Sequence, residues 1–341
     1  MKAIVIDRPG EFALRTVADP RPGPREVIVR VDHCGVCGTD LHVVEGNFAS
    51  TRYPLVPGHE LAGEIVAVGP EVSAWKVGDR VVADPSFQCG LCRQCRLGQD
   101  NLCDHFGGTG LTLDGGCAEF VRVAQDKAFR VPDGMPAAWA TLAEPLACAL
   151  RGLDRLPRHA GSSYLVYGAG TMGLLLAQLA ARGGASRVDV VDVHERRRAD
   201  AKRFAADAAV ASADELDRGA WDVVIDATGV PAAIADGLGR VVRGGTFLQF
   251  GVAPQDAAVT VSPARLAADE ITILGSMGIR GTFGRALDLL ARGDVIAADE
   301  MVTHQFPLDA YADALAAVRS GAGIKVQVTP SGVPAGKDGV A

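Results

Sequence analysis

A glycine motif between an apolar strand and a helix constrains the fold of this chain more than any other feature. Residues 164–167 are apolar and predict a strand, residues 168–173 read Gly-Ala-Gly-Thr-Met-Gly, and residues 174–182 predict a helix. Glycines at this spacing let the backbone approach a pyrophosphate, which the N-terminus of the helix then faces. The sequence therefore predicts a dinucleotide-binding unit whose cofactor contacts include Gly168, Gly170, Thr171, Met172 and Gly173.

An acidic residue ends the next predicted strand of this unit. Residues 188–191 read Val-Asp-Val-Val and lead to Asp192, which lies roughly 20 residues beyond the glycine motif, as a ribose-binding acid does. A carboxylate there would repel a 2′-phosphate, so the sequence favours NAD over NADP. The basic run 196–198 follows closely, and one of its arginines could soften that preference, although such runs are more often solvated helix faces.

Strands and helices go on alternating through the middle of the chain. This alternation predicts a parallel, doubly wound sheet and hence an α/β fold. A strand over 221–226 leads to Thr228, and a turn over 241–245 precedes a strand over 246–250 that leads to Gly251. We expect the loops after these two strands to pass the cofactor, which adds Thr228 and Gly251 to the predicted contacts.

The first part of the chain has a different pattern. Short runs that alternate apolar and polar residues, such as 27–31 and 61–68, are separated by Gly and Pro, which predicts an all-β, barrel-like region. A chain of 341 residues is long enough for two domains with separate cores. We therefore expect a barrel domain over 1–150 that is completed by 286–330, a dinucleotide-binding domain over 151–285, and a disordered Gly/Pro-rich tail over 331–341.

Four cysteines, Cys89, Cys92, Cys95 and Cys103, lie close together in a Gly-rich, polar loop. Four thiolates at this spacing can enclose one tetrahedral zinc and leave no open position, so the predicted ion is structural. Four unrelated buried thiols are a less favoured interpretation. A redox pair is also less favoured, because neither Cys-x-x-Cys pair opens a helix after a strand. The N-terminus has no signal-peptide layout, so we expect a cytoplasmic protein with reduced cysteines. Cys117 and Cys148 are expected to be small packed side chains.

Residues 37–42 place a thiol, a hydroxyl, a carboxylate and an imidazole within one short segment. A lone cysteine in an apolar, Gly-rich segment is usually only packed, but other ligand types recur further along the chain. Glu144 lies on a helix predicted over 137–150, in an apolar setting where a buried carboxylate needs a partner; the alternative is a carboxylate that faces solvent. The sequence predicts a catalytic zinc held by Cys37, His59, Glu60 and Glu144, with the Thr39 hydroxyl placed to pass a proton.

These motifs in combination resemble the zinc-dependent medium-chain dehydrogenase superfamily over essentially residues 1–330. The segment 144–146, Glu-Pro-Leu, is similar to the polyol (sorbitol- and arabitol-type) and threonine dehydrogenase branches, whereas other alcohol dehydrogenases have a zinc-binding cysteine in place of Glu144. The resemblance implies a GroES-like β-barrel catalytic domain, a Rossmann domain, a catalytic and a structural zinc ion in each chain, and a homodimer or homotetramer. It also implies oxidation of an alcohol to a ketone with NAD, and less readily with NADP.

The resemblance also implies roles for the zinc-site residues. Cys37 and His59 match zinc ligands, and Glu60 matches an acid that binds zinc in polyol dehydrogenases and lies just outside it in others. Glu144 matches the fourth position, either as a ligand or as an acid that holds the zinc-bound water. Asp40 matches a carboxylate that orients the histidine ligand.

The same resemblance implies further roles around the site. Thr39 and His42 match a proton relay that leads to solvent. Asp192, with Arg197 nearby, matches the contacts to the adenosine ribose. The cysteines between 89 and 103 match the structural zinc loop.

Three positions depart from the patterns of individual branches. Sorbitol-type enzymes carry an Arg-Tyr pair that is missing from the aligned segment 278–283, and they have Tyr where this chain has Val43. Threonine dehydrogenases usually carry aspartate where Glu144 stands. We therefore expect a small polyol or sugar-alcohol substrate, with a cyclitol, an aminocyclitol or L-threonine as alternatives, because the fold alone does not determine the substrate.

Charge and hydropathy exclude several other classes of partner. The net charge of -7 argues against nucleic acid and anionic membranes, and no apolar run is long enough to span a bilayer. A non-catalytic, zinc-poor binding protein of the same fold is the alternative from another class. The complete set of predicted ligands and relay residues argues against that alternative.

Overall fold

The computed structural model describes residues 1–48, 50–157 and 159–332 and shows two compact units. Unit 1 comprises Met1–Glu144, Phe283–Arg292 and the chain from Ala298 onward, and unit 2 comprises Pro145–Thr282 and Gly293–Ala297. The division falls within helix α4 (Ala143–Asp154), a few residues before the predicted boundary at 150. None of the helices in the described part of the chain combines the length and apolar character needed to cross a membrane.

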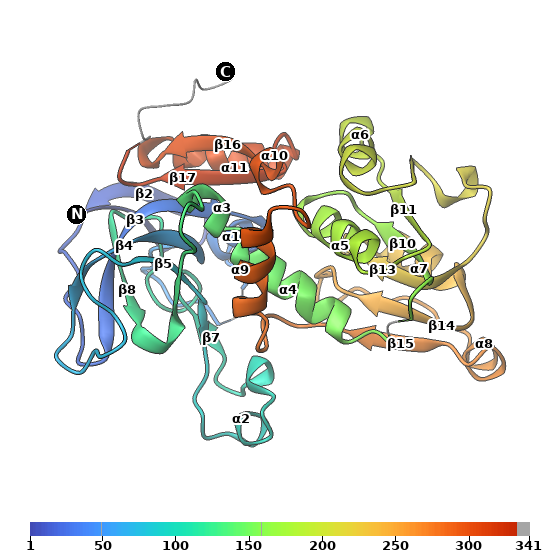
Figure 1. Cartoon of the computed structure of the whole chain (residues 1–341), viewed down its shortest axis with the longest axis horizontal. Helices are drawn as coiled ribbons and strands as arrows, with labels where there is room; N and C mark the ends of the chain where they lie inside the picture. Colours follow the sequence, from blue (N-terminus) through green and yellow to red (C-terminus); the bar gives the residue numbers. More distant parts are fainter. Residues whose placement is uncertain (49, 158, 333–341) are drawn as a thin grey trace. The chain divides into compact units, whose positions relative to one another are not determined.

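Unit 1 is organised around a seven-stranded sheet, with two-stranded sheets β1-β2 and β6-β7 in addition (Figure 1). The main sheet has the order β16-β17-β3-β4-β5-β9, and β8 pairs with the first part of β3. Val27, Val29 and Val31 of β3 all enter the core, because alternate residues of a strand face the same side. The strands of this unit are β1 (Lys2–Arg8), β2 (Glu11–Thr16), β3 (Glu26–Val36), β4 (Glu60–Val68), β5 (Arg80–Ala83), β6 (Ser86–Phe87), β7 (Gly107–Gly108), β8 (Phe120–Ala124), β9 (Ala128–Arg130), β16 (Val302–Pro307) and β17 (Lys325–Thr329).

Unit 1 also contains helices. One of them, α1, lies in the part predicted to be all-β, so that part is rich in strands as predicted but not free of helix. Helix α1 forms because Cys37 and Asp40 make a capping box at its start and Gly46 adopts the left-handed conformation at its end. Helix α11 packs on β16 and β17 (Figure 1). The helices are α1 (Gly38–Glu45), α2 (Arg93–Arg96), α3 (Ala137–Ala140), α9 (Phe283–Arg292), α10 (Ala298–Met301) and α11 (Tyr311–Ser320), with short 3-10 helices at Asp100–Leu102, Gln125–Lys127 and Leu308–Ala310.

Unit 2 contains a six-stranded parallel sheet with the order β12-β11-β10-β13-β14-β15. This is the doubly wound order of a Rossmann sheet, with the switch point between β10 and β13, so the α/β prediction is confirmed. The strands are β10 (Ser163–Tyr167), β11 (Arg187–Val191), β12 (Ala208–Val210), β13 (Trp221–Asp226), β14 (Val241–Gln249) and β15 (Thr272–Gly275). Helices α5 (Thr171–Arg182), α6 (Glu195–Phe204), α7 (Pro231–Gly239) and α8 (Pro263–Ala268), with a 3-10 helix at Ala213–Glu215, complete this unit with most of α4.

Three local predictions differ from the structure. The turn predicted over 241–245 is part of β14, because Val241 already pairs with Trp221 and an irregularity in register absorbs the glycines. The helix predicted over 137–150 is divided into α3 and α4. Most of the predicted tail, residues 333–341, lies outside the described residues, and Ser331 near its start donates its hydroxyl to the carbonyl of Val31 at 2.6 Å.

Candidate active site

Cys37 lies at the junction between strand β3 and helix α1. As the N-cap residue, its Sγ accepts a hydrogen bond from the backbone N–H of Thr39 at 3.3 Å. In return, its own backbone N–H donates to Oδ2 of Asp40 at 2.9 Å. This capping box holds a thiol and a carboxylate at the start of one helix, where the helix dipole favours negative charge.

His59 directly precedes strand β4, and Glu60 is the first residue of that strand. Glu60 is in register with Gly35, two residues before Cys37, so the start of β4 brings both side chains beside the cysteine. Nε2 of His59 lies 3.2 Å from Sγ of Cys37, and its Nδ1 lies 3.5 Å from Oδ1 of Asp40. The structure thus places the Asp40 carboxylate behind the imidazole, where it can orient the ring.

The ligand atoms of Cys37, His59 and Glu60 lie within 4.8 Å of one another. Thiolate, imidazole and carboxylate are donors that zinc prefers, so these three residues fit the ion. Burial alone would lower the pKa of His59, but the negative charges of Cys37 and Asp40 raise it well above its usual value. A cation bound to Nε2 would take the place of that proton, because metal ligands must be deprotonated.

Glu144 lies in the first turn of α4 and is half-buried. It is not one of the three residues whose ligand atoms lie within 4.8 Å of one another. Its charge nevertheless contributes to raising the pKa of Lys325, the buried lysine that contacts Glu60. Glu144 therefore lies near the site, and its predicted binding to zinc stays a prediction.

Thr39 and His42 are three positions apart on helix α1, a spacing that places both side chains on one helix face. Thr39, next to the Cys37 thiol in the helix cap, is half-buried, whereas His42 is exposed. His42 is thus the more exposed of the two residues, and their predicted proton relay stays a prediction.

The sequence analysis missed Lys325, which is 1% exposed and forms an ion pair with Glu60. Burial would lower the pKa of this lysine, but the charges of Glu60 and then of Cys37 raise it above its usual value. The available signal was a lysine at the start of an apolar strand, where charged side chains are rare unless they are paired.

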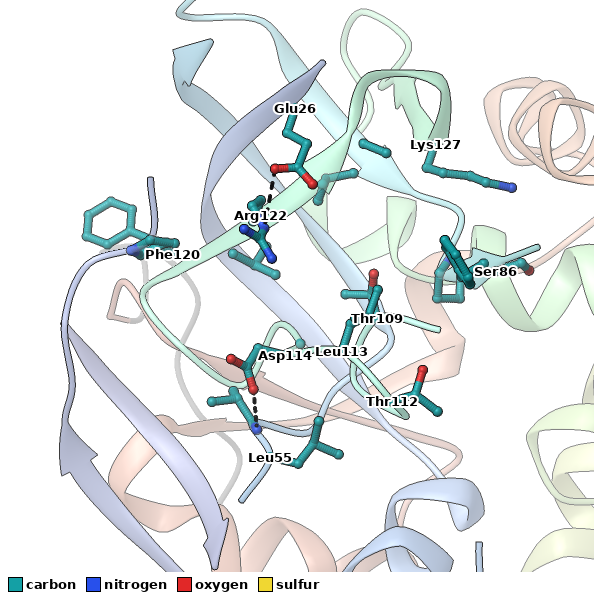
Figure 2. A pocket seen from close by; sticks show the side chains of 18 of the residues that line it. Glu26, Leu55, Ser86, Thr109, Thr112, Leu113, Asp114, Phe120, Arg122 and Lys127 are labelled. Carbon is teal, nitrogen blue, oxygen red and sulfur yellow. Dashed lines mark hydrogen bonds and ion pairs between the residues drawn. The ribbon is translucent and has the colours of Figure 1, made fainter. Parts of the chain in front are cut away.

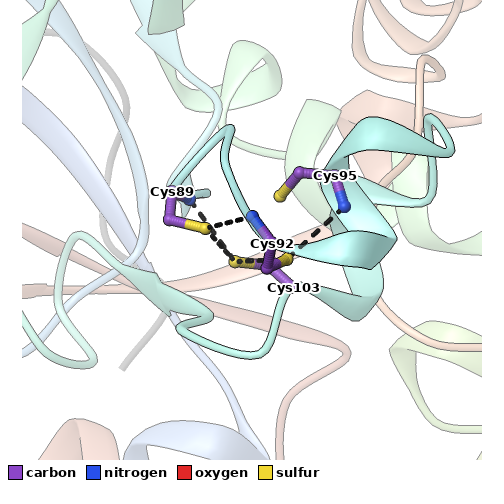
Figure 3. A group of neighbouring side chains, drawn as sticks. All are labelled: Cys89, Cys92, Cys95 and Cys103. Atoms are coloured by element: carbon purple, nitrogen blue, oxygen red, sulfur yellow. Dashed lines mark hydrogen bonds between the residues drawn. The ribbon is translucent and has the colours of Figure 1, made fainter.

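The four-cysteine loop forms a second candidate metal site (Figure 3). The four sulfurs lie within 4.8 Å of one another, with 3.5 Å between those of Cys89 and Cys103. Cys92 is the N-cap of the short helix α2, but that helix follows a loop, so the expectation that neither pair opens a helix after a strand is not contradicted. The hydrogen bond from the N–H of Cys95 lowers the pKa of Cys92 to about 6. A four-sulfur set of this size fits a tetrahedral zinc with a closed coordination shell.

The glycine motif in unit 2 has the geometry of a dinucleotide-binding turn. Gly168 has a φ of +94°, and a Cβ on Gly173 would lie 1.7 Å from the carbonyl oxygen of Gly168. Gly170 is the N-cap of α5, and a Cβ there would meet nothing within 4 Å. The first and third glycines are therefore required by the turn, while the second leaves open space before the helix N-terminus, next to the half-buried Thr171 and Met172.

These contacts predict different outcomes for two alanine variants. Gly173→Ala should lower the melting temperature, because its methyl group would collide with the backbone of Gly168. Gly170→Ala should keep the melting temperature of the wild type but weaken NAD binding, because its methyl group would fill space proposed for the pyrophosphate. Thermal unfolding and NAD titration distinguish the two. Equal melting temperatures for both variants would contradict the assignment.

Asp192 follows β11 and reaches the glycine motif directly. Its Oδ2 accepts from the N–H of Ala169 at 2.8 Å, and its Oδ1 accepts from the N–H of His194 at 2.8 Å. Nη1 of Arg197 lies 3.9 Å from Oδ2 of Asp192, whereas Arg196 is exposed. The structure brings Asp192 and Arg197 together and adds His194, which the sequence analysis did not single out.

Thr228 and Gly251 meet at the carboxyl ends of β13 and β14, beside the switch point of the sheet. Both are tied to Asp226, which accepts from the N–H of Thr228 at 3.0 Å through its side chain and from Gly251 at 2.8 Å through its carbonyl. A Cβ on Gly251 would lie 2.3 Å from the backbone nitrogen of Gly229. Crevices at this edge of a doubly wound sheet are where dinucleotides bind.

Unit 1 also contains a cavity of about 870 Å³ that none of the predicted zinc ligands line (Figure 2). Its walls include the ion pair of Glu26 with Arg122, at 3.4 Å, and Asp114, whose Oδ1 accepts from the N–H of Val56 at 3.0 Å. Lys127 and Asp84 form a second ion pair on these walls, at 3.8 Å. The cavity is therefore lined by residues other than those of the candidate zinc site.

Two family models match the chain. Residues 23–133 match the alcohol dehydrogenase GroES-like domain, and residues 171–292 match the zinc-binding dehydrogenase domain. D-arabinitol dehydrogenase 1 of Uromyces fabae is 39% identical over 97% of each chain. D-altritol 5-dehydrogenase of Agrobacterium fabrum is 37% identical over 86% of this chain and 88% of its own.

Solved structures show the same architecture. A zinc-binding dehydrogenase from Sinorhizobium meliloti bound to NADP has a TM-score of 0.92 and 33% identity, over 96% of this chain and 99% of its own. An alcohol dehydrogenase from Escherichia coli in complex with NADH has a TM-score of 0.89 and 28% identity over the same shares. The two similar structures thus contain different nicotinamide cofactors.

Proposed function

This chain belongs to the zinc-dependent medium-chain dehydrogenases, in the branch of the polyol dehydrogenases, and we propose that it oxidises a secondary alcohol of a polyol or sugar alcohol to the ketone. Hydride passes to NAD in this reaction. The observation that carries the proposal is the convergence of Cys37, His59 and Glu60 within 4.8 Å, in a chain that also has a Rossmann sheet with a dinucleotide-binding turn.

The residues of unit 1 divide the chemistry among them. A zinc ion held by Cys37, His59 and Glu60 would polarise the substrate hydroxyl and lower its pKa. Asp40 fixes the orientation of His59, and Glu144 either completes the ligand set or holds a water molecule beside it. The Thr39 hydroxyl would take up the proton of the substrate hydroxyl as it releases its own, and His42 would pass the released proton to solvent.

The residues of unit 2 bind and orient the cofactor. The glycine motif and the N-terminus of α5 receive the pyrophosphate, and Thr228 and Gly251 border the crevice beside the switch point. Asp192 accepts hydrogen bonds from the ribose hydroxyls, with Arg197 beside it. These groups have only to hold the nicotinamide in position, because hydride transfer is chemistry of the cofactor itself.

Replacing Asp192 by alanine should weaken NAD binding about 10-fold, because a charged hydrogen-bond acceptor is lost. It should also reduce the difference in kcat/KM between NAD and NADP. The ratio of kcat/KM for the two cofactors measures the effect. Arg196→Ala, an exposed neighbour, should leave the ratio unchanged and serves as the control. An unchanged ratio in the Asp192 variant would remove this residue from the ribose site.

The substrate is tested on a panel of alcohols. Pentitols, hexitols, inositols, aminocyclitols, L-threonine and simple secondary alcohols are assayed with NAD and NADP, with and without a chelator. We expect a pentitol or hexitol to turn over in a chelator-sensitive manner, because the similar proteins are named for D-arabinitol and D-altritol. A cyclitol, an aminocyclitol or L-threonine is the second candidate, since the Arg-Tyr pair of sorbitol-type enzymes is missing.

The zinc content of the purified protein separates this proposal from a non-catalytic binding protein. One zinc ion at each of the two candidate sites would support the enzymatic function. An empty site at Cys37, together with no turnover of any alcohol in the panel, would support a non-catalytic binding protein. We further propose a cytoplasmic homodimer or homotetramer that uses no nucleic acid or membrane partner. The reduced thiols that both sites need are consistent with that compartment.

A further inference from the structure

A buried lysine neutralises one of the candidate zinc ligands. Nζ of Lys325 lies 2.5 Å from Oε1 and 2.5 Å from Oε2 of Glu60, and each of the two residues is only 1% exposed. The partners are 265 residues apart in the sequence. A charged pair this deep in a protein is costly to desolvate, so its position calls for a functional reason.

The sheet is built to let the two side chains meet. Strand β3 lies between β4 and β17, with Gly35 in register with both Glu60 and Gln327. A Cβ on Gly35 would lie 1.8 Å from Oε2 of Glu60. The carboxylate can therefore cross β3 toward Lys325 only because residue 35 has no side chain.

When a metal is bound, the Glu60 carboxylate lies near two cations, which are that metal and the ammonium group of Lys325. Its ligand atom lies within 4.8 Å of those of Cys37 and His59, so a metal held there competes with Lys325 for Glu60. A carboxylate that is paired with an ammonium group donates less charge to a metal than a free one does. Lysine suits this role because its ammonium is a compact charge on a flexible stem.

We propose that Lys325 is a positioning residue that keeps Glu60 an exchangeable ligand, so that one position at the catalytic zinc stays available to the substrate hydroxyl. The inference rests on the proposed function, since it requires a metal at Cys37 and His59. Without the ammonium group, Glu60 would have the metal as its remaining cation and would bind it permanently. The open position that catalytic zinc sites keep would then be occupied.

Cobalt(II) substitution tests this directly, because the visible absorption of the ion reports its ligands and their number. The signal of the catalytic site is the spectrum of each variant minus that of Cys37→Ser, which retains only the four-cysteine site. We expect Lys325→Met to change the cobalt bands and to lower kcat about 10- to 100-fold, as loss of a partner behind a ligand does. Lys325→Arg, which keeps the charge, should largely restore both.

A double variant shows whether Lys325 acts through Glu60. Glu60→Gln and the double variant Glu60→Gln/Lys325→Met should have the same cobalt spectrum, because Lys325 then has no Glu60 carboxylate to act on. The double variant buries neither charge of the pair, so it remains informative even if Lys325→Met alone does not fold. The inference would be overturned if Lys325→Met had the cobalt spectrum of the wild type. It would also be overturned if replacing Lys325 changed the spectrum as much in the Glu60→Gln variant as in the wild type. If the wild type and Cys37→Ser have identical spectra, the proposed catalytic site itself is wrong.

Discussion

Replacing Cys37 by serine is expected to abolish turnover and to remove one zinc ion from each chain. A serine hydroxyl does not ionise near neutral pH and is a poor zinc ligand, whereas the sulfur at this position is a ligand that zinc prefers and accepts a hydrogen bond from the N–H of Thr39 at the start of α1. Loss of a residue behind a ligand costs roughly 10- to 100-fold, and loss of the ligand itself should cost more. Metal analysis and steady-state kinetics measure the two effects.

A neighbouring cysteine provides the control for this variant. Cys34 lies on strand β3, which leads to Cys37, and is fully buried, but it is not among the residues that could hold a metal. Cys34→Ala should lower stability through lost packing while both zinc ions remain bound. NAD binding should persist in Cys37→Ser, because unit 2 contains the candidate contacts. Turnover like that of the wild type in Cys37→Ser would exclude this residue as a catalytic ligand.

Replacing Cys103 by serine should release the other zinc and destabilise the chain by several kcal/mol. The loop over 89–103 contains only the short helix α2 and one 3-10 turn, so its cysteines supply much of its order. The binding free energy of a structural zinc, about 10–16 kcal/mol in isolated zinc-finger peptides, contributes to folding because the unfolded chain has no preformed site. We expect a lower melting temperature and faster proteolysis at Arg93 and Arg96.

The two cysteine variants should fail in opposite ways. Cys37→Ser keeps the loop resistant to protease and loses turnover, whereas Cys103→Ser loses the resistance first and turnover only as the protein unfolds. A chelator that lowers the melting temperature of the wild type but not of Cys103→Ser would connect the effect to this site. If Cys103→Ser retained both zinc ions and its stability, the structural role would be wrong.

Motifs whose members are close in sequence could be predicted without the structure. The spacing of Cys89, Cys92 and Cys95 limits how far apart their sulfurs can lie, so a compact four-sulfur site follows from the chain itself once Cys103 folds back. The glycine motif at 168–173 is similar, because the turn it makes depends on the backbone freedom of those residues. Alternating strands and helices then determined the parallel sheet, which the structure confirms.

Local pattern was less informative where tertiary contacts decide the backbone. Helix α1 was missed because a capping box of cysteine and aspartate is a weak signal inside a strand-like region. Strand β14 begins earlier than predicted because Val241 pairs with Trp221 on a neighbouring strand. In both cases a contact that the sequence does not display outweighed the local preference.

The sequence by itself determined the reaction class, because Cys37, His59 and Asp192 stand in motifs that resemble those of the zinc-dependent medium-chain dehydrogenases. Only the tertiary structure decided which side chain pairs with the candidate zinc ligand Glu60. Glu60 meets Lys325 because strand register brings together residues 265 positions apart, and because Gly35 leaves room between them. Covalent spacing constrains neighbours along the chain, whereas contacts across strands depend on register, which the packing of the whole sheet sets.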